Sequence, residues 1–157
     1  FLITSGAKRK RLESYGIVGK HIKREFFSVR NDYLRILQRQ EILILALDWP
    51  DESPIHEDEL ATIFPTKTPE YLASGRPILL HCPDHYFLAR FFEENQCGLV
   101  VAERSVDKLI KACQYLLEGG PEVDKMRQSA LNTAHNFALA RVAKIFKDEV
   151  EDVIQIK

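Results

Sequence analysis

Residues 68–81 read TPEYLASGRPILLH and contain a short helix with both ends marked, followed at once by an apolar strand. Thr68 suits the position that caps a helix, and Pro69 suits its first turn. Gly75 suits the left-handed residue that ends a helix, and Pro77 prevents the helix from continuing. The apolar residues directly behind Pro77 then predict a strand.

Further apolar runs on both sides of this segment also predict strands. Residues 42–47 are apolar at every position, which is typical of a central parallel strand covered on both faces. Shorter strands are expected at residues 1–4, 22–27 and 98–101. An acidic, proline-containing loop is expected between residues 48 and 60.

Helices are expected between these strands. Ser28 or Asn31 is expected to cap a helix that carries Tyr33 to Leu37, and Asp84 a helix that carries Phe87 to Phe92. Ser105 is expected to cap an amphipathic helix that carries Val106 to Leu117. Two further helices are expected at about 123–137 and 140–154. The alternation predicts an α/β, Rossmann-like domain of three layers around a parallel sheet. At 157 residues we expect one domain over residues 1–157.

Composition narrows the classes of partner. Lys and Arg (22) nearly balance Asp and Glu (23), so we do not expect a nucleic-acid-binding protein. Three scattered cysteines and five histidines without ligand spacing indicate no disulfide framework and no metal site. No apolar run approaches the ~20 residues that span a bilayer, and no signal peptide is visible, so we expect a cytoplasmic protein.

The start of the helix at residue 68 has a chemical interpretation of its own. Free N–H groups and the positive end of the helix dipole attract an anion there, and Lys67 adds a charge. Glu70 would repel a phosphate beside it, but its two oxygens suit the hydroxyl pair of a ribose. A diphosphate and a ribose together describe a nucleotide. The alternative remains open that Glu70 merely matches the helix dipole and that Lys67 is solvated.

The segment from Phe64 to Pro77 resembles the donor-binding motif of retaining GT-B glycosyltransferases of family four, group 1, in which Pro-Ser/Thr-Lys precedes Glu-Tyr-Leu-Ala and Gly-Lys/Arg-Pro. Residues 98–101 and the later helices are also similar. The resemblance runs from about Tyr33 to Val150 and implies the C-terminal, nucleotide-sugar-binding half of such an enzyme. It implies no bound cofactor and no metal.

The resemblance also implies roles for individual residues. Glu70 matches the glutamate that binds the ribose, and Thr66, Lys67 and Thr68 match the loop that receives the diphosphate. Contacts with the base or the sugar are implied, in the family layout, for Gly6, Phe27, Ser28 and His85. Thr62 stands where the family often has a second glutamate that reaches the donor sugar.

Two further features depart from the family pattern. The chain begins at Phe1 with what resembles the family's second strand, so we expect a fragment that lacks the first strand and its cationic residues. We also expect the N-terminal acceptor domain to be missing, and the fragment alone to be inactive. The basic residues 8–11 are expected on a solvated helix face. No residue suggests a nucleophile, so no catalytic residue is assigned.

The resemblance therefore implies transfer of a hexose from a UDP- or GDP-sugar to a glycan or lipid-linked acceptor. A parent enzyme of this kind is expected in the cytoplasm, with peripheral association at the inner face of the membrane. In the family the last helix often crosses to the other domain, so apolar surface is expected on residues 140–154. Two alternatives stay open: a nucleotide-sugar epimerase-like domain, and a non-catalytic Rossmann-like binding module.

Overall fold

A computed structural model describes residues 2–3, 24–25 and 30–155, and its contacts divide the chain into two units, Phe1–Ile36 and Leu37–Lys157. In the first unit, β1 (Leu2–Ile3) and β2 (Arg24–Glu25) pair in parallel. Helix α2 (Arg30–Arg39) begins in the first unit and ends in the second. Asn31 lies inside α2 and so does not cap it, while Ser28 lies outside the described residues.

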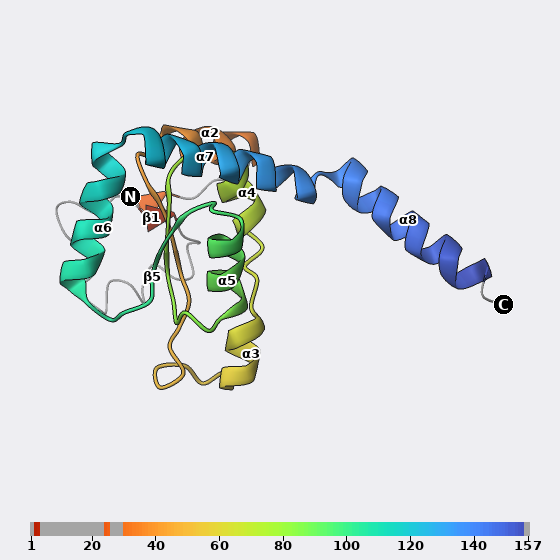
Figure 1. Cartoon of the computed structure of the whole chain (residues 1–157), viewed down its shortest axis with the longest axis horizontal. Coiled ribbons are helices and arrows are strands. Elements are labelled where there is room, and N and C mark those ends of the chain that lie inside the picture. Colours follow the sequence, from red (N-terminus) through yellow and green to blue (C-terminus); the bar gives the residue numbers. More distant parts are fainter. Residues whose placement is uncertain (1, 4–23, 26–29, 156–157) are drawn as a thin grey trace. The chain divides into compact units, whose positions relative to one another are not determined.

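The second unit contains a parallel sheet in the order β3-β4-β5 (Figure 1). Its strands are β3 (Leu43–Ala46), β4 (Ile78–His81) and β5 (Leu99–Val101). Leu43 lies opposite Ile78, and Leu79 lies opposite Leu99. The parallel α/β architecture expected from the sequence is therefore confirmed.

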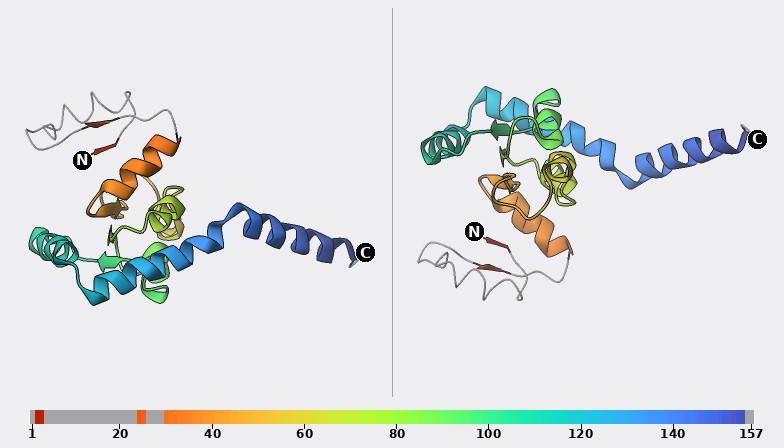
Figure 2. Two further views of the ribbon diagram at one scale, coloured as in Figure 1. Left: turned by 90° about the horizontal axis from the view of Figure 1, so that it is seen from above. Right: turned by 90° about the horizontal axis from the view of Figure 1, so that it is seen from below.

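Helices cover both faces of this sheet. The helices after β3 are α3 (Glu57–Thr62), α4 (Thr68–Ala73), α5 (Phe87–Glu94), α6 (Val106–Glu118), α7 (Pro121–Ala134), the 3-10 turn η1 (His135–Phe137) and α8 (Leu139–Gln155). Of these, α8 does not cover the sheet but extends away from it (Figure 1). Figures 1 and 2 show α6 on one face, and α4 with α5 on the other. Within the second unit this is the expected three-layer arrangement.

Side chains alternate between the two faces of β4, and both faces are buried. On one face Leu79 packs with Val101 of β5 and with Leu116 of α6. The neighbouring residues Ile78 and Leu80 are equally buried, as the alternation of a strand between two helical layers requires. The core therefore lies on both sides of β4.

Strand β3 differs from its sequence-based interpretation. Leu43 and Leu45 are buried, but Ile44 is 54% exposed. Ala46, which points to the same face as Ile44, is exposed as well, so one face of β3 is not covered by any described element. An apolar run alone does not reveal whether a second helical layer reaches the strand, and the prediction of a strand covered on both faces is wrong for the described chain.

The helix starts bear out one expected cap and correct two. Ser105 caps α6, since its hydroxyl accepts a hydrogen bond from the Lys108 N–H. Thr68 does not cap α4, because the helix begins at Thr68 itself and Lys67 holds the cap position without a side-chain capping hydrogen bond. Asp84 does not cap α5, which begins three residues later behind Tyr86.

The expected loop between residues 48 and 60 also contains a helix. Helix α3 starts at Glu57, and the His56 side chain accepts a hydrogen bond from the Asp58 N–H at its start. Its first turn is acidic, which suits the positive end of the helix dipole. Leu60 anchors the helix by burial.

Candidate functional site

The loops that follow the strands gather at one edge of the sheet. The loops after β3, β4 and β5 all leave from the lower edge in Figure 1, next to α3. In open parallel sheets, ligands bind outside these carboxyl ends. The expected ribose and diphosphate residues follow α3 in the chain, at the entrance to α4.

A tight turn leads into α4. The Thr68 N–H donates to the Pro65 carbonyl at 2.9 Å, and the Lys67 carbonyl accepts from the Tyr71 N–H at 3.0 Å. Thr66 and Lys67 are exposed on this turn, whereas Thr68 is 0% exposed. Of the three residues implied for diphosphate binding, two therefore face solvent.

The backbone at this entrance offers an anion fewer N–H donors than the sequence suggests. The Thr68 N–H is already engaged, and Pro69 has no N–H. The Thr68 hydroxyl is buried and has no hydrogen-bond partner among the described residues. Helix α4 has 6 residues, so its dipole is short. An anion here would depend on the Lys67 side chain as well as on the helix end.

Glu70 lies half-buried in the first turn of α4. Burial, and in second place the nearby Glu70 charge, raise the pKa of the Tyr71 phenol. The Lys67 ammonium lies 5.7 Å from the centre of the same Tyr71 ring. The carboxylate implied for the ribose and the cation implied for the diphosphate thus both lie close to Tyr71.

His85 and Thr62 have contacts within the protein. The His85 Nε2 atom lies 3.2 Å from a Glu57 carboxylate oxygen, and its Nδ1 atom lies 3.6 Å from Asp84. The Thr62 hydroxyl donates back to the Asp58 and Glu59 carbonyls of its own helix. The remaining residues implied for base or sugar contacts lie outside the described residues: Gly6, Phe27 and Ser28.

A cluster at the carboxyl edge was not anticipated from the sequence. The Trp49 ring lies 5.6 Å from the His81 ring and 4.6 Å from the Arg104 guanidinium. Arg104 also forms an ion pair with Asp51, and this hydrogen-bonded pair holds the pKa of the Asp51 carboxyl below its usual range. Arg104 lies in the loop after β5, so the rule that ligand-facing loops follow strands would have indicated it.

The cluster holds the loop after β3 against the ends of the neighbouring strands. Trp49 follows β3, His81 ends β4 and Arg104 follows β5. Tyr86 adds a further contact, since its hydroxyl donates to the Asp48 carbonyl at 3.2 Å. The loop after β3 is therefore fixed by contacts with the segments that follow both other strands.

Aromatic rings connect the α3–α4 segment to the end of α7. Phe64 stacks on Phe137 of η1 with ring centres 5.5 Å apart, and it meets Phe91 of α5 edge-on at 5.2 Å. Such pairs stabilise beyond the area they bury. These ring contacts join the segment before α4 to α5 and to η1, which precedes α8.

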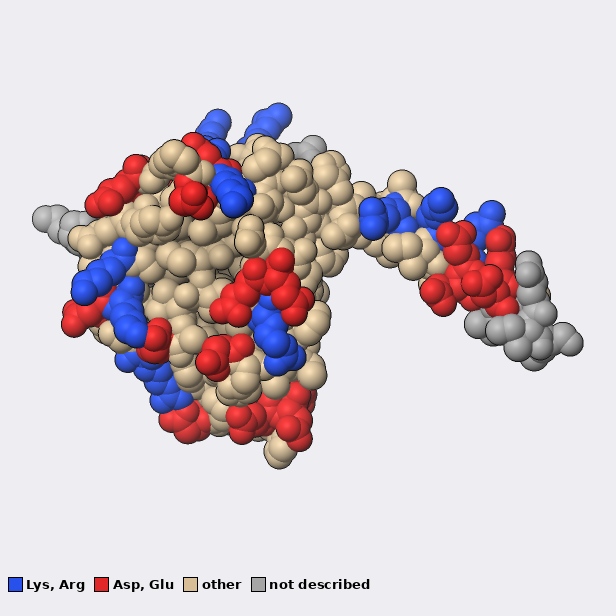
Figure 3. Space-filling model, in the orientation of Figure 1, with Lys and Arg blue, Asp and Glu red and all other residues tan. Residues whose placement is uncertain are grey.

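Charged side chains and potential metal ligands are scattered over the described part of the chain. Lys and Arg alternate with Asp and Glu across the face shown in Figure 3. Within residues 2–3, 24–25 and 30–155, no three His, Cys, Asp or Glu side chains are grouped as metal ligands would be. None of the described helices combines the length and apolar character that a membrane crossing requires.

Comparison with known proteins gives one informative result. No family model and no curated protein matches the chain. Among solved structures it is similar to WaaG, a glycosyltransferase involved in lipopolysaccharide biosynthesis, at 20% sequence identity and a TM-score of 0.51. The similarity covers 82% of this chain and 31% of the WaaG chain. At this identity the likeness concerns the fold, and the chain has the α/β fold of one part of a glycosyltransferase.

Proposed function

We propose that this chain is the nucleotide-sugar-binding domain of a glycosyltransferase. The fold it shares with part of WaaG supports a domain of this class. The observation that carries the proposal is the α4 entrance, where exposed Lys67 and half-buried Glu70 lie within one helical turn of each other. A cation for the diphosphate and a carboxylate for the ribose hydroxyls are the two groups that a nucleotide requires.

The proposed reaction is transfer of a hexose from a UDP- or GDP-sugar to a glycan or lipid-linked acceptor. Catalysis would rest on stabilising the departing diphosphate rather than on a nucleophile of this domain. We place the parent enzyme in the cytoplasm, at the inner face of the membrane. Cys82, Cys97 and Cys113 are all free thiols, as is usual in a reducing compartment.

The exposed apolar residues of helix α8 are consistent with a second protein domain that packs against this one. They include Leu139 (84%) and Phe146 (71%). With Val142, Val150 and Ile154 they form a stripe at helical spacing. An apolar stripe of this length is typical of a surface that packs against other protein. We propose that it contacts the acceptor-binding half of the enzyme.

A calorimetric titration with UDP, GDP and their hexose conjugates tests the donor site. Hydrogen bonds to a charged group contribute about 1.5–3 kcal/mol, so Glu70→Gln should weaken nucleotide binding roughly 10–100-fold. Glu118→Gln removes an exposed carboxylate at the end of α6 and should leave the affinity unchanged. The absence of binding by every nucleotide would reject the proposal for this chain.

A second titration isolates the contact between Glu70 and the ribose. Loss of the 2′-hydroxyl, from UDP to 2′-deoxy-UDP, should weaken binding to the native chain. The same loss should have little further effect on the Glu70→Gln variant, because the partner of that hydroxyl is already impaired. Equal losses in both proteins would show that Glu70 does not contact the ribose.

A further inference from the structure

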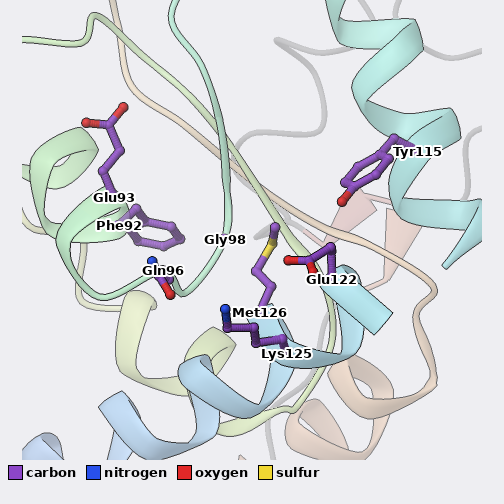
Figure 4. A pocket seen from close by; sticks show the side chains of 8 residues that line it. All are labelled: Phe92, Glu93, Gln96, Gly98, Tyr115, Glu122, Lys125 and Met126. Atoms are coloured by element: carbon purple, nitrogen blue, oxygen red, sulfur yellow. The ribbon is translucent and has the colours of Figure 1, made fainter. Parts of the chain in front are cut away.

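We infer that a pocket at the opposite edge of the sheet binds a neutral saccharide unit. The pocket lies beside Gly98, which precedes β5, and therefore at the amino end of that strand. It has a volume of about 360 Å³, within the range of small-molecule sites. Figure 4 shows side chains from α5, α6 and α7 around it. The residues of the proposed donor site do not line it.

The polar side chains around this pocket are not engaged with other described side chains and are open to a ligand. Elsewhere on the described surface, Arg104 pairs with Asp51, Lys108 with Glu103 and Arg127 with Asp124. The lining contains both carboxylates and an ammonium group, yet these groups make no ion pair or side-chain hydrogen bond to any residue that the structure describes. The polar residues concerned are Glu93, Gln96, Tyr115, Glu122 and Lys125.

Gln96 supplies a second, independent observation. It has a φ of +50°, and among the non-glycine residues described it is the one with a positive φ. The Gln96 N–H donates to the Glu93 carbonyl and the Cys97 N–H to the Phe92 carbonyl, which is the usual pattern at the end of a helix. Glycine adopts this conformation without strain. A glutamine therefore occupies a glycine-favouring position, and its side chain lines the pocket.

The mixture of groups selects the chemistry of the ligand. An anion would meet the carboxylates of Glu93 and Glu122, and a cation would meet the ammonium of Lys125. A hydrocarbon would remove water from all the polar groups and replace none of their hydrogen bonds. Hydroxyl groups both donate and accept, so a neutral polyhydroxylated molecule can pair with carboxylate, amide, phenol and ammonium together.

The apolar part of the pocket lining suits the C–H groups of a sugar ring. Phe92 lies beneath the pocket and has no exposed surface, so the half-buried Met126 and Gly98 supply the accessible apolar surface of the lining. The C–H groups of a pyranose can pack on this apolar surface while its hydroxyls reach the polar rim. Tyr115, which is partly exposed, adds an aromatic ring at the side. A saccharide unit is thus the neutral ligand that matches both parts of the lining.

An NMR titration of the ¹⁵N-labelled 157-residue chain tests this inference. The probes are the methyl glycosides of glucose, galactose and mannose at millimolar concentrations. At least one should shift the amides of residues 96–98 and 125–126 in a saturable manner. No shift at these amides by any glycoside would overturn the inference. So would saturable shifts there with acetate or tetramethylammonium but with no glycoside.

Variants connect the binding to the pocket. Gln96→Gly and Tyr115→Phe should each weaken glycoside binding by roughly tenfold, the effect of one lost hydrogen bond. Gln96→Gly should also raise Tm, because glycine relieves the positive φ. A higher Tm with unchanged affinity in both variants would overturn the inference. Glu118→Gln is the matched control on α6, and Glu70→Gln should not alter glycoside binding, so failure here is separate from failure of the donor site.

Discussion

Thr68 offers a direct test of how the entrance to α4 is built. Its side chain is 0% exposed, and its hydroxyl oxygen has no hydrogen-bond partner among the described residues. A buried polar group without a partner loses its hydration and gains nothing in return. Thr68→Val keeps the branched shape of the side chain and replaces the hydroxyl with a methyl group. The substitution should therefore stabilise the protein.

The expected gain follows from the cost of an unsatisfied group. That cost is about 1–3 kcal/mol for a neutral donor or acceptor, and each kcal/mol shifts Tm by about 2–4 °C in a domain of this size. Urea unfolding followed by circular dichroism should give a higher midpoint with an unchanged slope, since the buried surface is unchanged. Titration of UDP into the variant should give the native affinity, because a hydroxyl inside the core does not contact a ligand.

The neighbouring threonine provides the control. Thr66 is exposed on the same turn, so Thr66→Val should change the free energy of unfolding by less than about 0.5 kcal/mol. A Thr68→Val variant that is less stable by more than about 1 kcal/mol would refute the reasoning, because it would show that the hydroxyl has a partner. Native stability with weaker UDP binding would refute it differently, by placing the hydroxyl at the ligand.

The other predictions concern packing and thiol chemistry. Gly98→Ala should destabilise the chain by about 1–3 kcal/mol, as measured by urea unfolding, because a Cβ at this position would lie 2.6 Å from the Phe92 ring; a stability equal to that of the native chain would contradict this. Burial raises the pKa of the Cys82 and Cys97 thiols to about 12, so iodoacetamide at pH 8 should alkylate Cys113 and spare both in the folded chain, as read by mass spectrometry. When pH rises above the pKa of an unfolded thiol, these two cysteines ionise in the unfolded chain but remain protonated in the folded chain. The free energy of unfolding should therefore fall as pH rises.

Local patterns in the sequence were enough to predict a helix end where that end depends on a single residue. Gly75 has a φ of +67° and stops α4, as its position before Pro77 predicts. Ser105 caps α6 through its own hydroxyl. In both places the residue type and the backbone conformation are linked directly, because glycine tolerates a positive φ and a hydroxyl can accept from a nearby N–H.

Features that depend on distant residues could not be predicted in this way. Asp51 and Arg104 are 53 residues apart, and their pairing exists because β3 and β5 end at the same edge of one sheet. The exposure of Ile44 likewise depends on whether another element packs on its face of β3. Sequence periodicity reports which side chains are apolar, whereas the packing of elements distant in sequence decides which of them are covered.

The strength of the proposed donor site depends on how few backbone donors α4 presents. The Thr68 N–H is bound to Pro65 and Pro69 has none, so the first turn presents fewer N–H groups than a helix start without proline. A helix of 6 residues also adds little dipole. The diphosphate would then be held largely by charge, through exposed Lys67, and its binding should weaken as salt screens that charge. The hydrogen bonds between Glu70 and a ribose act at short range, so they would supply the part of the affinity that salt leaves intact.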